Sequence, residues 1–154
     1  MRSPNFIIAG ERRCGTTTLA NTLSRHSDIF VHPKPDGGYF IDDSVGKKAS
    51  ATGQAWASSH SLEDYQAWFL SAGAGSESAL GEKSADYLFW HKSHPRMANF
   101  VPDAKLIVIL RHPIDRAWSH YWNEVAKGRE TLGFEEAIAA EAGRLEGSDY
   151  ERYM

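Results

Sequence analysis

The chain has 154 residues, of which 42% are hydrophobic, and a formal net charge of −3 at pH 7. This length and composition are typical of one globular domain, which we assign to residues 1–154. A nearly neutral chain lacks the broad basic field of a nucleic-acid-binding or membrane-surface protein, so any anion site must be local. Cys14 is the only cysteine, which excludes an internal disulfide and favours a reducing compartment.

No apolar run approaches the roughly 20 residues needed to span a bilayer. The N-terminus also lacks the long apolar core of a signal peptide. We therefore expect no membrane segment and a cytoplasmic location, with a removed anchor or targeting segment as the alternative. The sequence gives no indication of the oligomeric state.

The most informative segment is residues 6–19, Phe-Ile-Ile-Ala-Gly-Glu-Arg-Arg-Cys-Gly-Thr-Thr-Thr-Leu. It predicts a short strand, a loop with glycines at the spacing of the Walker motif G-x-x-x-x-G-K-[ST], and a helix. Backbone N–H groups in such a loop converge on one point, and the helix dipole adds positive potential there, so we expect a phosphate-binding site. Thr16 stands where an NTPase has lysine, so the loop should bind phosphate without ATPase activity.

Several side chains of this loop can add donors to an anion site. Gly15 lets the backbone approach a ligand closely. Hydroxyl groups and arginines supply further hydrogen bonds and charge. The alternative is an ordinary strand-to-helix turn with surface arginines. Cys14 is expected to be a small packing residue rather than a nucleophile. The candidate binding residues are Arg12, Arg13, Cys14, Gly15, Thr16, Thr17 and Thr18.

The segments that follow alternate between helix and strand patterns. Residues 16–25 lack internal Gly and Pro and have leucines four positions apart, which predicts a helix packed on the sheet. Residues 29–31 predict a strand, and the Pro- and Gly-rich residues 32–38 predict an irregular loop that lines a site. Residues 42–60 are rich in Ser, Gly, Ala and Lys and predict a surface excursion, with a lid as the less favoured alternative.

The middle of the chain predicts two further helices and a strand. Ser61 precedes a segment with acidic residues in its first turn and apolar residues at the spacing of one face, which is typical of a capped helix. Residues 79–84 predict the end of a strand. Ser93, followed by an early proline, predicts the cap of another helix.

The clearest later strand is at residues 106–110, five consecutive branched apolar residues that predict a parallel strand buried on both faces. Arg111 follows its carboxyl end, which is where open α/β sheets bind ligands, so it should lie beside the loop at residues 10–15. Pro113 suits a helix start, and Ser119 lies on the polar side of that helix. Its apolar stripe comprises Ile114, Ala117, Trp118, Tyr121, Trp122 and Val125.

A last helix is predicted over residues 134–145, with Gly147 beyond its end. The alternation of strands and helices predicts the α/β class, as a three-layer domain with a central parallel sheet flanked by helices. No internal repeat interrupts this order.

Residues 10–19 and 110–121 together resemble the two cofactor motifs of the sulfotransferases that use 3′-phosphoadenosine 5′-phosphosulfate (PAPS), in that family's order. In the family, the first loop holds the 5′-phosphosulfate end, and the R-x-P-x-x-R-A-x-S-x-Y segment supplies an arginine and a serine to the 3′-phosphate. The matching residues are Arg111 and Ser119. Residues 82–87 are similar to the E-K-S/T-P-x-Y segment of the heparan-sulfate-type and related bacterial branch.

This resemblance implies a P-loop-like fold and transfer of a sulfuryl group from PAPS to a hydroxyl or amine. The acceptor would be a carbohydrate or a small molecule, the product would be adenosine 3′,5′-bisphosphate (PAP), and no metal would be needed. It implies no nucleic-acid partner. The family's later glycine-rich segment has no counterpart before Met154, so we expect the chain to be truncated at its C-terminus.

The chain departs from the family at positions that carry catalysis. The branch usually has lysine at the place of Arg13 and a K-E-x-x-[YF]-F segment, whereas residues 34–40 read Lys-Pro-Asp-Gly-Gly-Tyr-Phe. Counting back from Tyr39 puts Asp36 at the place of the family's glutamate base, and His32 is the alternative base.

The catalytic residues implied by the resemblance are Asp36 as base and Arg13 and Lys83 as donors to the developing charge. Asp36 could instead organise the turn, and Lys83 could be a solvated charge. No metal ligands are expected, because the H-x-x-H spacing of His91 and His94 is a poor metal signal by itself. The alternative functions are a P-loop kinase or NTPase and a non-catalytic PAP-binding fragment.

Overall fold

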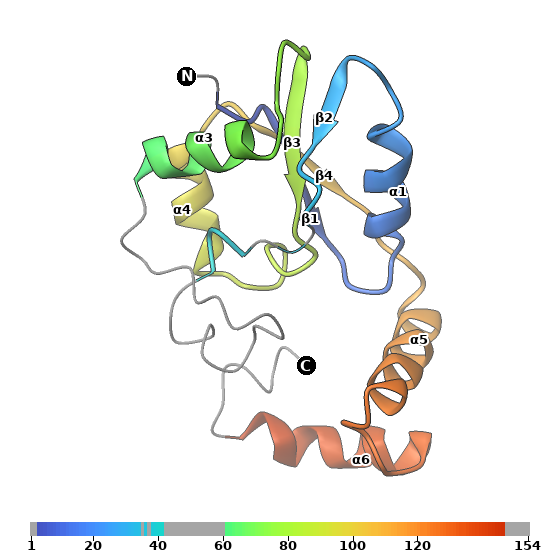
Figure 1. Cartoon of the computed structure of the whole chain (residues 1–154). Helices are drawn as coiled ribbons and strands as arrows, with labels where there is room; N and C mark the ends of the chain where they lie inside the picture. Colours follow the sequence, from blue (N-terminus) through green and yellow to red (C-terminus); the bar gives the residue numbers. More distant parts are fainter. Residues whose placement is uncertain (1–2, 35, 37, 42–60, 147–154) are drawn as a thin grey trace.

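The computed structural model describes residues 3–34, 36, 38–41 and 61–146, and its described part is an α/β structure (Figure 1). The sheet has four parallel strands in the order β2-β3-β1-β4. This arrangement confirms the predicted parallel sheet. The strands are β1 (Phe6–Gly10), β2 (Ile29–Val31), β3 (Ala79–Lys83) and β4 (Lys105–Val108).

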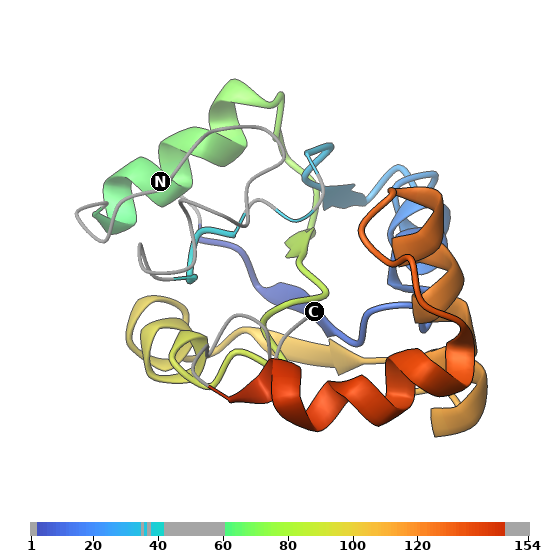
Figure 2. The same ribbon diagram turned by 90° about the horizontal axis from the view of Figure 1, so that it is seen from below.

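Helices cover both faces of the sheet. Figures 1 and 2 show α1 on one side and α3 and α4 on the other, while α5 and α6 follow β4 and extend past the carboxyl end of the strands. The predicted three-layer arrangement is therefore confirmed. The helices are α1 (Thr16–Leu23), α3 (Leu62–Ser71), α4 (Ser93–Phe100), α5 (Pro113–Ala126) and α6 (Phe134–Leu145).

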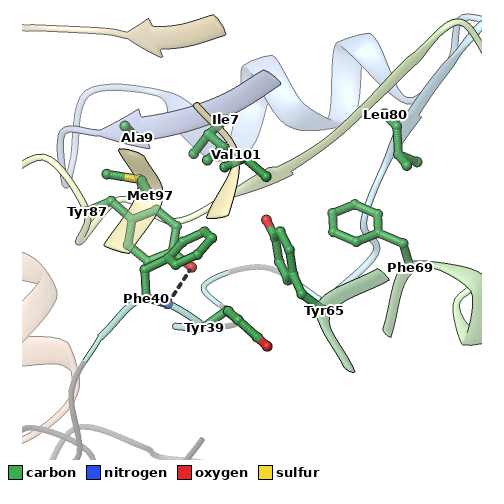
Figure 3. Close-up of a cluster of buried hydrophobic side chains, with 10 residues drawn as sticks. All are labelled: Ile7, Ala9, Tyr39, Phe40, Tyr65, Phe69, Leu80, Tyr87, Met97 and Val101. Carbon is green, nitrogen blue, oxygen red and sulfur yellow. Dashed lines mark hydrogen bonds between the residues drawn. The ribbon is translucent and has the colours of Figure 1, made fainter. Parts of the chain in front are cut away.

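The main core lies between the sheet and the helices α3 and α4. It is rich in aromatic rings, and Figure 3 shows these rings converging beneath β1. We refer to it as the aromatic core; it comprises Ile7, Ala9, Tyr39, Phe40, Tyr65, Phe69, Leu80, Tyr87, Met97 and Val101. A smaller cluster of Phe6, Ile8, Ala20 and Val31 lies on the side of α1. Strand β1 belongs to both clusters, which is why all of its residues are buried.

The predicted cap of α3 is confirmed, and the predicted cap of α4 is wrong. The Ser61 hydroxyl accepts a hydrogen bond from the Asp64 amide at 3.2 Å, and the Asp64 carboxylate accepts one from the Ser61 amide at 2.9 Å. Ser93 is instead the first residue inside α4, and its hydroxyl donates to the Tyr87 carbonyl at 2.9 Å. Its side chain is used to tie the helix to the preceding turn, so it is not free to cap.

The prediction of a strand buried on both faces at residues 106–110 is wrong. Strand β4 is an edge strand that pairs only with β1 among the described strands. Leu106 is 57% exposed and Val108 is 43% exposed, because no described element packs on that side. The predicted stripe of α5 behaves in the same way, since Ile114, Trp118 and Trp122 are 68%, 48% and 51% exposed.

Two further expectations concern residues 42–60 and membrane-spanning segments. The predicted surface excursion at residues 42–60 lies outside the described residues. Among the helices that the structure describes, none combines the length and the apolar character that crossing a membrane requires.

Candidate functional site

The loop after β1 leads into α1 with its glycines in the conformations that the motif requires. Gly15 precedes the helix with φ of 96°, a left-handed value that disfavours other residues. A Cβ atom placed there would meet no atom within 4 Å. No side chain caps α1, so its first N–H groups remain available to an anion in the open space beside Gly15. Of the three threonines, Thr16 is buried and Thr17 and Thr18 are exposed.

Gly10 serves a different purpose, because it permits close packing against the turn after β3. A Cβ atom at Gly10 would lie 2.7 Å from the Leu88 Cβ, which is closer than two carbon atoms can approach. The backbone of the same region joins β4: the Glu11 amide donates to the Ile109 carbonyl at 2.9 Å, and the Ile109 amide donates to the Gly10 carbonyl at 2.9 Å. The two predicted motifs therefore start side by side.

The side chain of Arg13 connects the loop to α5. Its Nε donates to the Ser119 hydroxyl at 3.1 Å, and one terminal nitrogen donates to the Asn123 side-chain oxygen at 3.1 Å. The structure thus brings together a residue from each predicted motif, 106 positions apart. Arg111 lies two residues after Ile109 at the same edge of the sheet, and its side chain is exposed. Asn123 was not predicted as a site residue, although its place four residues after Ser119 puts it on the same face of a helix.

A charged cluster at the end of α5 orients Asn123. The Asn123 amide nitrogen donates to the Glu124 carboxylate at 2.7 Å, so its oxygen is left for Arg13. Burial of Glu124 opposes its ionisation, but hydrogen bonds from Arg129 and Lys127 outweigh this and lower its pKa to about 2. The sequence analysis did not identify this cluster.

Arg12 and Cys14 face the protein in this structure. The Arg12 Nε lies 2.6 Å from the Asp86 carboxylate, in an ion pair that attaches the loop to the turn after β3. Burial raises the pKa of Asp86, and its contact with Arg12 opposes that shift. The half-buried Cys14 thiol donates to the Arg12 carbonyl at 3.5 Å. Asp86 belongs to the motif at residues 82–87, but the motif alone does not indicate its pairing with Arg12.

Asp36 and Lys83 form an ion pair at the end of β3, with 2.7 Å between Lys83 Nζ and the carboxylate. The second carboxylate oxygen accepts a hydrogen bond from the Ala85 amide at 3.0 Å, and the Asp36 amide donates to the Lys83 carbonyl at 2.9 Å. Lys83 is 3% exposed, so the alternative of a solvated lysine is wrong. Since Lys83 is in register with Ile8, the ion pair lies at the same edge of the sheet as the glycine loop after β1.

The alternative base, His32, is occupied elsewhere. Its ring stacks on Trp68 with 3.5 Å between centroids, its Nδ1 accepts from the Lys34 amide at 3.1 Å, and its Nε2 lies 3.4 Å from the Trp68 carbonyl. Burial lowers the pKa of His32. With both ring nitrogens facing backbone groups, this side chain is poorly placed to receive a proton from an acceptor, and the geometry favours Asp36.

No metal centre is found among the described side chains: no three His, Cys, Asp or Glu residues there lie close enough to hold an ion. The arrangement that is found can bind an anion at the helix N-terminus, place arginines beside it, and present a carboxylate and an ammonium group at the neighbouring strand.

Comparisons with known proteins bear on the family and the fold of the chain. A model described as "Sulfotransferase family" matches residues 4–154. The crystal structure of a sulfotransferase from Alicyclobacillus acidocaldarius superposes with a TM-score of 0.77 at 34% sequence identity, covering 94% of this chain and 59% of that one.

Two curated relatives are similar over most of this chain. The bifunctional heparan sulfate N-deacetylase/N-sulfotransferase 1 of Caenorhabditis elegans is 30% identical over 144 residues, which are 93% of this chain and 15% of the relative. The membrane-associated sulfotransferase kil1 of Dictyostelium discoideum is 31% identical over 118 residues, 77% of this chain and 22% of the relative. This chain therefore spans less than a quarter of these two relatives. The family model, which matches nearly every residue, shows that the chain belongs to the sulfotransferase family.

Proposed function

We propose that this chain binds PAPS and transfers its sulfuryl group to a hydroxyl or amine of a carbohydrate or small-molecule acceptor. The single observation that carries the proposal is the hydrogen bond between Arg13 of the first motif and Ser119 of the second. It brings together, at one edge of the sheet, the groups that the resemblance assigns to the two ends of one donor molecule.

The donor would be held by backbone groups and by charge. The N–H groups at the start of α1 and the exposed hydroxyls of Thr17 and Thr18 would bind the 5′-phosphosulfate. Arg111 and Ser119 would bind the 3′-phosphate. The Arg13 guanidinium contacts Ser119 in this structure and would exchange that contact for donor oxygens, since arginine forms its stronger hydrogen bonds with anions.

In the proposed reaction, the acceptor oxygen or nitrogen attacks sulfur and forms the new bond. The bond between sulfur and the bridging oxygen breaks, and its electron pair leaves with PAP. The acceptor proton passes to the Asp36 carboxylate. Negative charge grows on the bridging oxygen, where Arg13 and Lys83 are the donors that stabilise it.

The ion pair with Lys83 is compatible with Asp36 acting as the base. A carboxylate has about four lone-pair sites, and the contacts with Lys83 and the Ala85 amide use two of them. The same pair would hold Lys83 close to the reacting centre. Asp36 also organises the turn, as the alternative prediction states, so the two roles are combined in one residue.

A donor-binding test separates this proposal from a kinase or NTPase. PAP should raise the midpoint of thermal unfolding far more than ADP does, and Mg²⁺ should add nothing. A ligand at 100 times its Kd adds about 2.7 kcal/mol to the free energy of unfolding, which is easily measured. A larger shift with ADP and Mg²⁺ would contradict the proposal.

A transfer assay tests the chemistry. Radiolabelled PAPS should pass its label to an acceptor, and the names of the heparan sulfate relatives make de-N-sulfated heparin the first probe, with N-acetylated heparin as the matched control without free amines. Label on both would indicate hydroxyl acceptors, and label on the first alone would indicate an amine. Binding of PAP with no transfer to a panel of carbohydrate and small-molecule acceptors would support the non-catalytic alternative.

A further inference from the structure

Glu82 is a buried carboxyl group that the proposed reaction does not use. It lies on β3 between β1 and β2, in register with Ile7, and its side chain is 0% exposed. Neighbouring residues on a strand point to opposite faces. The Lys83 side chain therefore lies at the proposed site, while the Glu82 side chain points into the aromatic core.

Two buried tyrosines donate hydrogen bonds to the same oxygen of Glu82. The Tyr65 hydroxyl, from α3, lies 2.5 Å from Oε1, and the Tyr87 hydroxyl, from the turn after β3, lies 3.2 Å from it. Both tyrosines are fully buried. The other carboxyl oxygen, Oε2, has no hydrogen-bond partner in the part of the chain that the structure describes.

Both tyrosine rings pack against Phe40, but in the described part of the chain it is the Tyr87 hydroxyl that hydrogen-bonds to the Phe40 backbone. The Tyr87 hydroxyl accepts a hydrogen bond from the Phe40 amide at 3.4 Å, drawn as the dashed line in Figure 3. Phe40 lies four residues after Asp36. The segment is thus held at one end by the Asp36 amide on the Lys83 carbonyl, and at the other end through Tyr87 by Glu82.

The burial of Glu82 is costly unless its hydrogen bonds compensate for the lost water. Burial raises the pKa of Glu82 to about 7, and the hydrogen bonds from Tyr65 and Tyr87 oppose the shift. An apolar residue would fill the same space at lower cost, but it would leave the hydroxyls of both tyrosines without their acceptor. The carboxyl group therefore orients Tyr87, whose hydroxyl accepts the hydrogen bond from the Phe40 amide.

We propose that Glu82 is a positioning residue for the reaction proposed above: acting through the Tyr87 hydroxyl, it fixes Phe40 and thereby places the Asp36 carboxylate relative to the phosphate loop. This inference rests on the proposed function. Lys83 then holds Asp36, and Glu82 holds Phe40 through Tyr87. Because Glu82 and Lys83 are consecutive residues of β3, the same strand positions the proposed base and Lys83. Rigid placement matters because a displacement of about 1 Å can lower the rate about 100-fold.

The two tyrosines provide a matched pair of variants. Tyr87→Phe and Tyr65→Phe each remove one hydroxyl from Glu82 and keep the ring, but only Tyr87→Phe removes the acceptor of the Phe40 amide. Amide hydrogen exchange should be roughly tenfold faster at Phe40 in Tyr87→Phe than in Tyr65→Phe. The Leu88 amide, which donates to the Ala9 carbonyl, should exchange alike in both and is the internal control.

Turnover with radiolabelled PAPS and the acceptor found in the transfer assay is the second readout. Tyr87→Phe should lower kcat about tenfold with KM for PAPS unchanged, and Tyr65→Phe should lower kcat much less. Equal loss of turnover in the two variants, or equal Phe40 exchange, would overturn the inference. Faster Phe40 exchange with unchanged kcat would overturn it too, because the contact would then be structural only.

A further variant keeps the test decisive if Tyr87→Phe does not fold. Glu82→Gln retains both tyrosines and weakens their acceptor, so it should raise the exchange of the Phe40 amide but not of the Leu88 amide. Unchanged exchange at Phe40 would overturn the inference. The exchange measurements require no acceptor, so they stand apart from the proposed function, which fails if the unmodified chain transfers no label.

Discussion

Apolar side chains are buried in the aromatic core, but many are exposed in residues 105–126, which we call the β4–α5 region. In the aromatic core, Tyr65 and Tyr87 are fully buried and Phe69 is 1% exposed. In the β4–α5 region, Leu110 is 71% exposed and Trp122 is 51% exposed. Both regions have regular apolar patterns in the sequence.

An apolar pattern therefore predicts which side of an element is apolar, but it does not predict what covers that side. Strand β3 is buried because β1 and β2 flank it and α3 covers it. Strand β4 has the more apolar sequence, but it has a neighbour on one side only among the described strands. Burial is a property of the neighbours as much as of the residue.

The largest expected effect comes from truncating a ring in the aromatic core. Phe69→Ala should lower the free energy of unfolding by about 3 to 5 kcal/mol, because it removes a large buried side chain and leaves a cavity. The matched variant Trp122→Ala, in the β4–α5 region, should cost less than about 1 kcal/mol. Urea unfolding measures both. Equal losses in the two variants would contradict the difference in burial between the two regions, since Trp122 would then be covered in solution.

Arg13 connects the loop after β1 to α5 of the β4–α5 region, and its loss should affect the proposed catalysis far more than stability. Arg13→Ala removes a group that the proposed mechanism assigns as a donor to the developing charge, so it should lower kcat by about 100- to 1,000-fold. Its bonds to Ser119 and Asn123 are exposed, so the free energy of unfolding should fall by less than about 1 kcal/mol. The control is Arg25→Ala, an exposed arginine after α1. Unchanged turnover in Arg13→Ala would remove this residue from the mechanism.

Glu82, whose buried carboxyl group lies beside the tyrosines of the aromatic core, should make the free energy of unfolding depend on pH. The pKa of Glu82 is raised from 4.5 to about 7 in the folded chain, mainly by burial, so the folded state binds more protons between these values. The stability that this group contributes is present below pH 4.5 and is lost as the pH rises through about 7.

Glu82→Gln, which does not titrate, provides the reference for this effect. The free energy of unfolding of the unmodified chain, relative to Glu82→Gln, should fall by about 3 kcal/mol between pH 4.5 and pH 8. Chemical unfolding across that range measures it. A difference that stays constant with pH would show that Glu82 titrates normally and that its burial is incomplete in solution.

The smallest effect concerns the capping box of α3, which supports the aromatic core from outside. Ser61→Ala should lower the free energy of unfolding by about 1 kcal/mol, because the Asp64 amide loses its acceptor. Ser27→Ala, at an exposed position, should change it much less. Thermal unfolding of the two variants makes the comparison, and equal midpoints would mean that the cap adds nothing to the stability of α3.

The elements of the fold could be predicted where their signals are local. The strand, glycine loop and helix at residues 6–23 were predicted from an apolar run and glycine spacing, and α3 from a capping pattern, because these signals act within a few residues. The cap of α4 was predicted wrongly, because Ser93 has a stronger use in bonding the preceding turn. A local sequence pattern does not show whether a side chain will hydrogen-bond to its own helix or to another part of the fold.

The candidate site was predicted in part. Arg13 and Ser119 were both named from motifs, and the structure joins them. Asp36 and Lys83 were named separately and form an ion pair. Asn123 and the partnership of Arg12 with Asp86 were missed, because side-chain pairing across elements depends on register and helix orientation, which residue types alone do not specify.

The amino-acid pattern alone was sufficient to predict the succession of strands and helices along the chain, the unit of strand, glycine loop and helix that begins at Phe6, and the sulfotransferase family. Local backbone preferences and the spacing of apolar residues specify the succession of these elements, whereas the family follows from a resemblance of motifs. The folded arrangement of the elements sets which apolar faces are covered, which carboxyl groups are buried and which side chain each arginine contacts. These properties depend on contacts between residues that are far apart in the chain, such as Arg13 with Ser119 and Phe40 with Tyr87, and such contacts exist only once the sheet has set the positions of its strands.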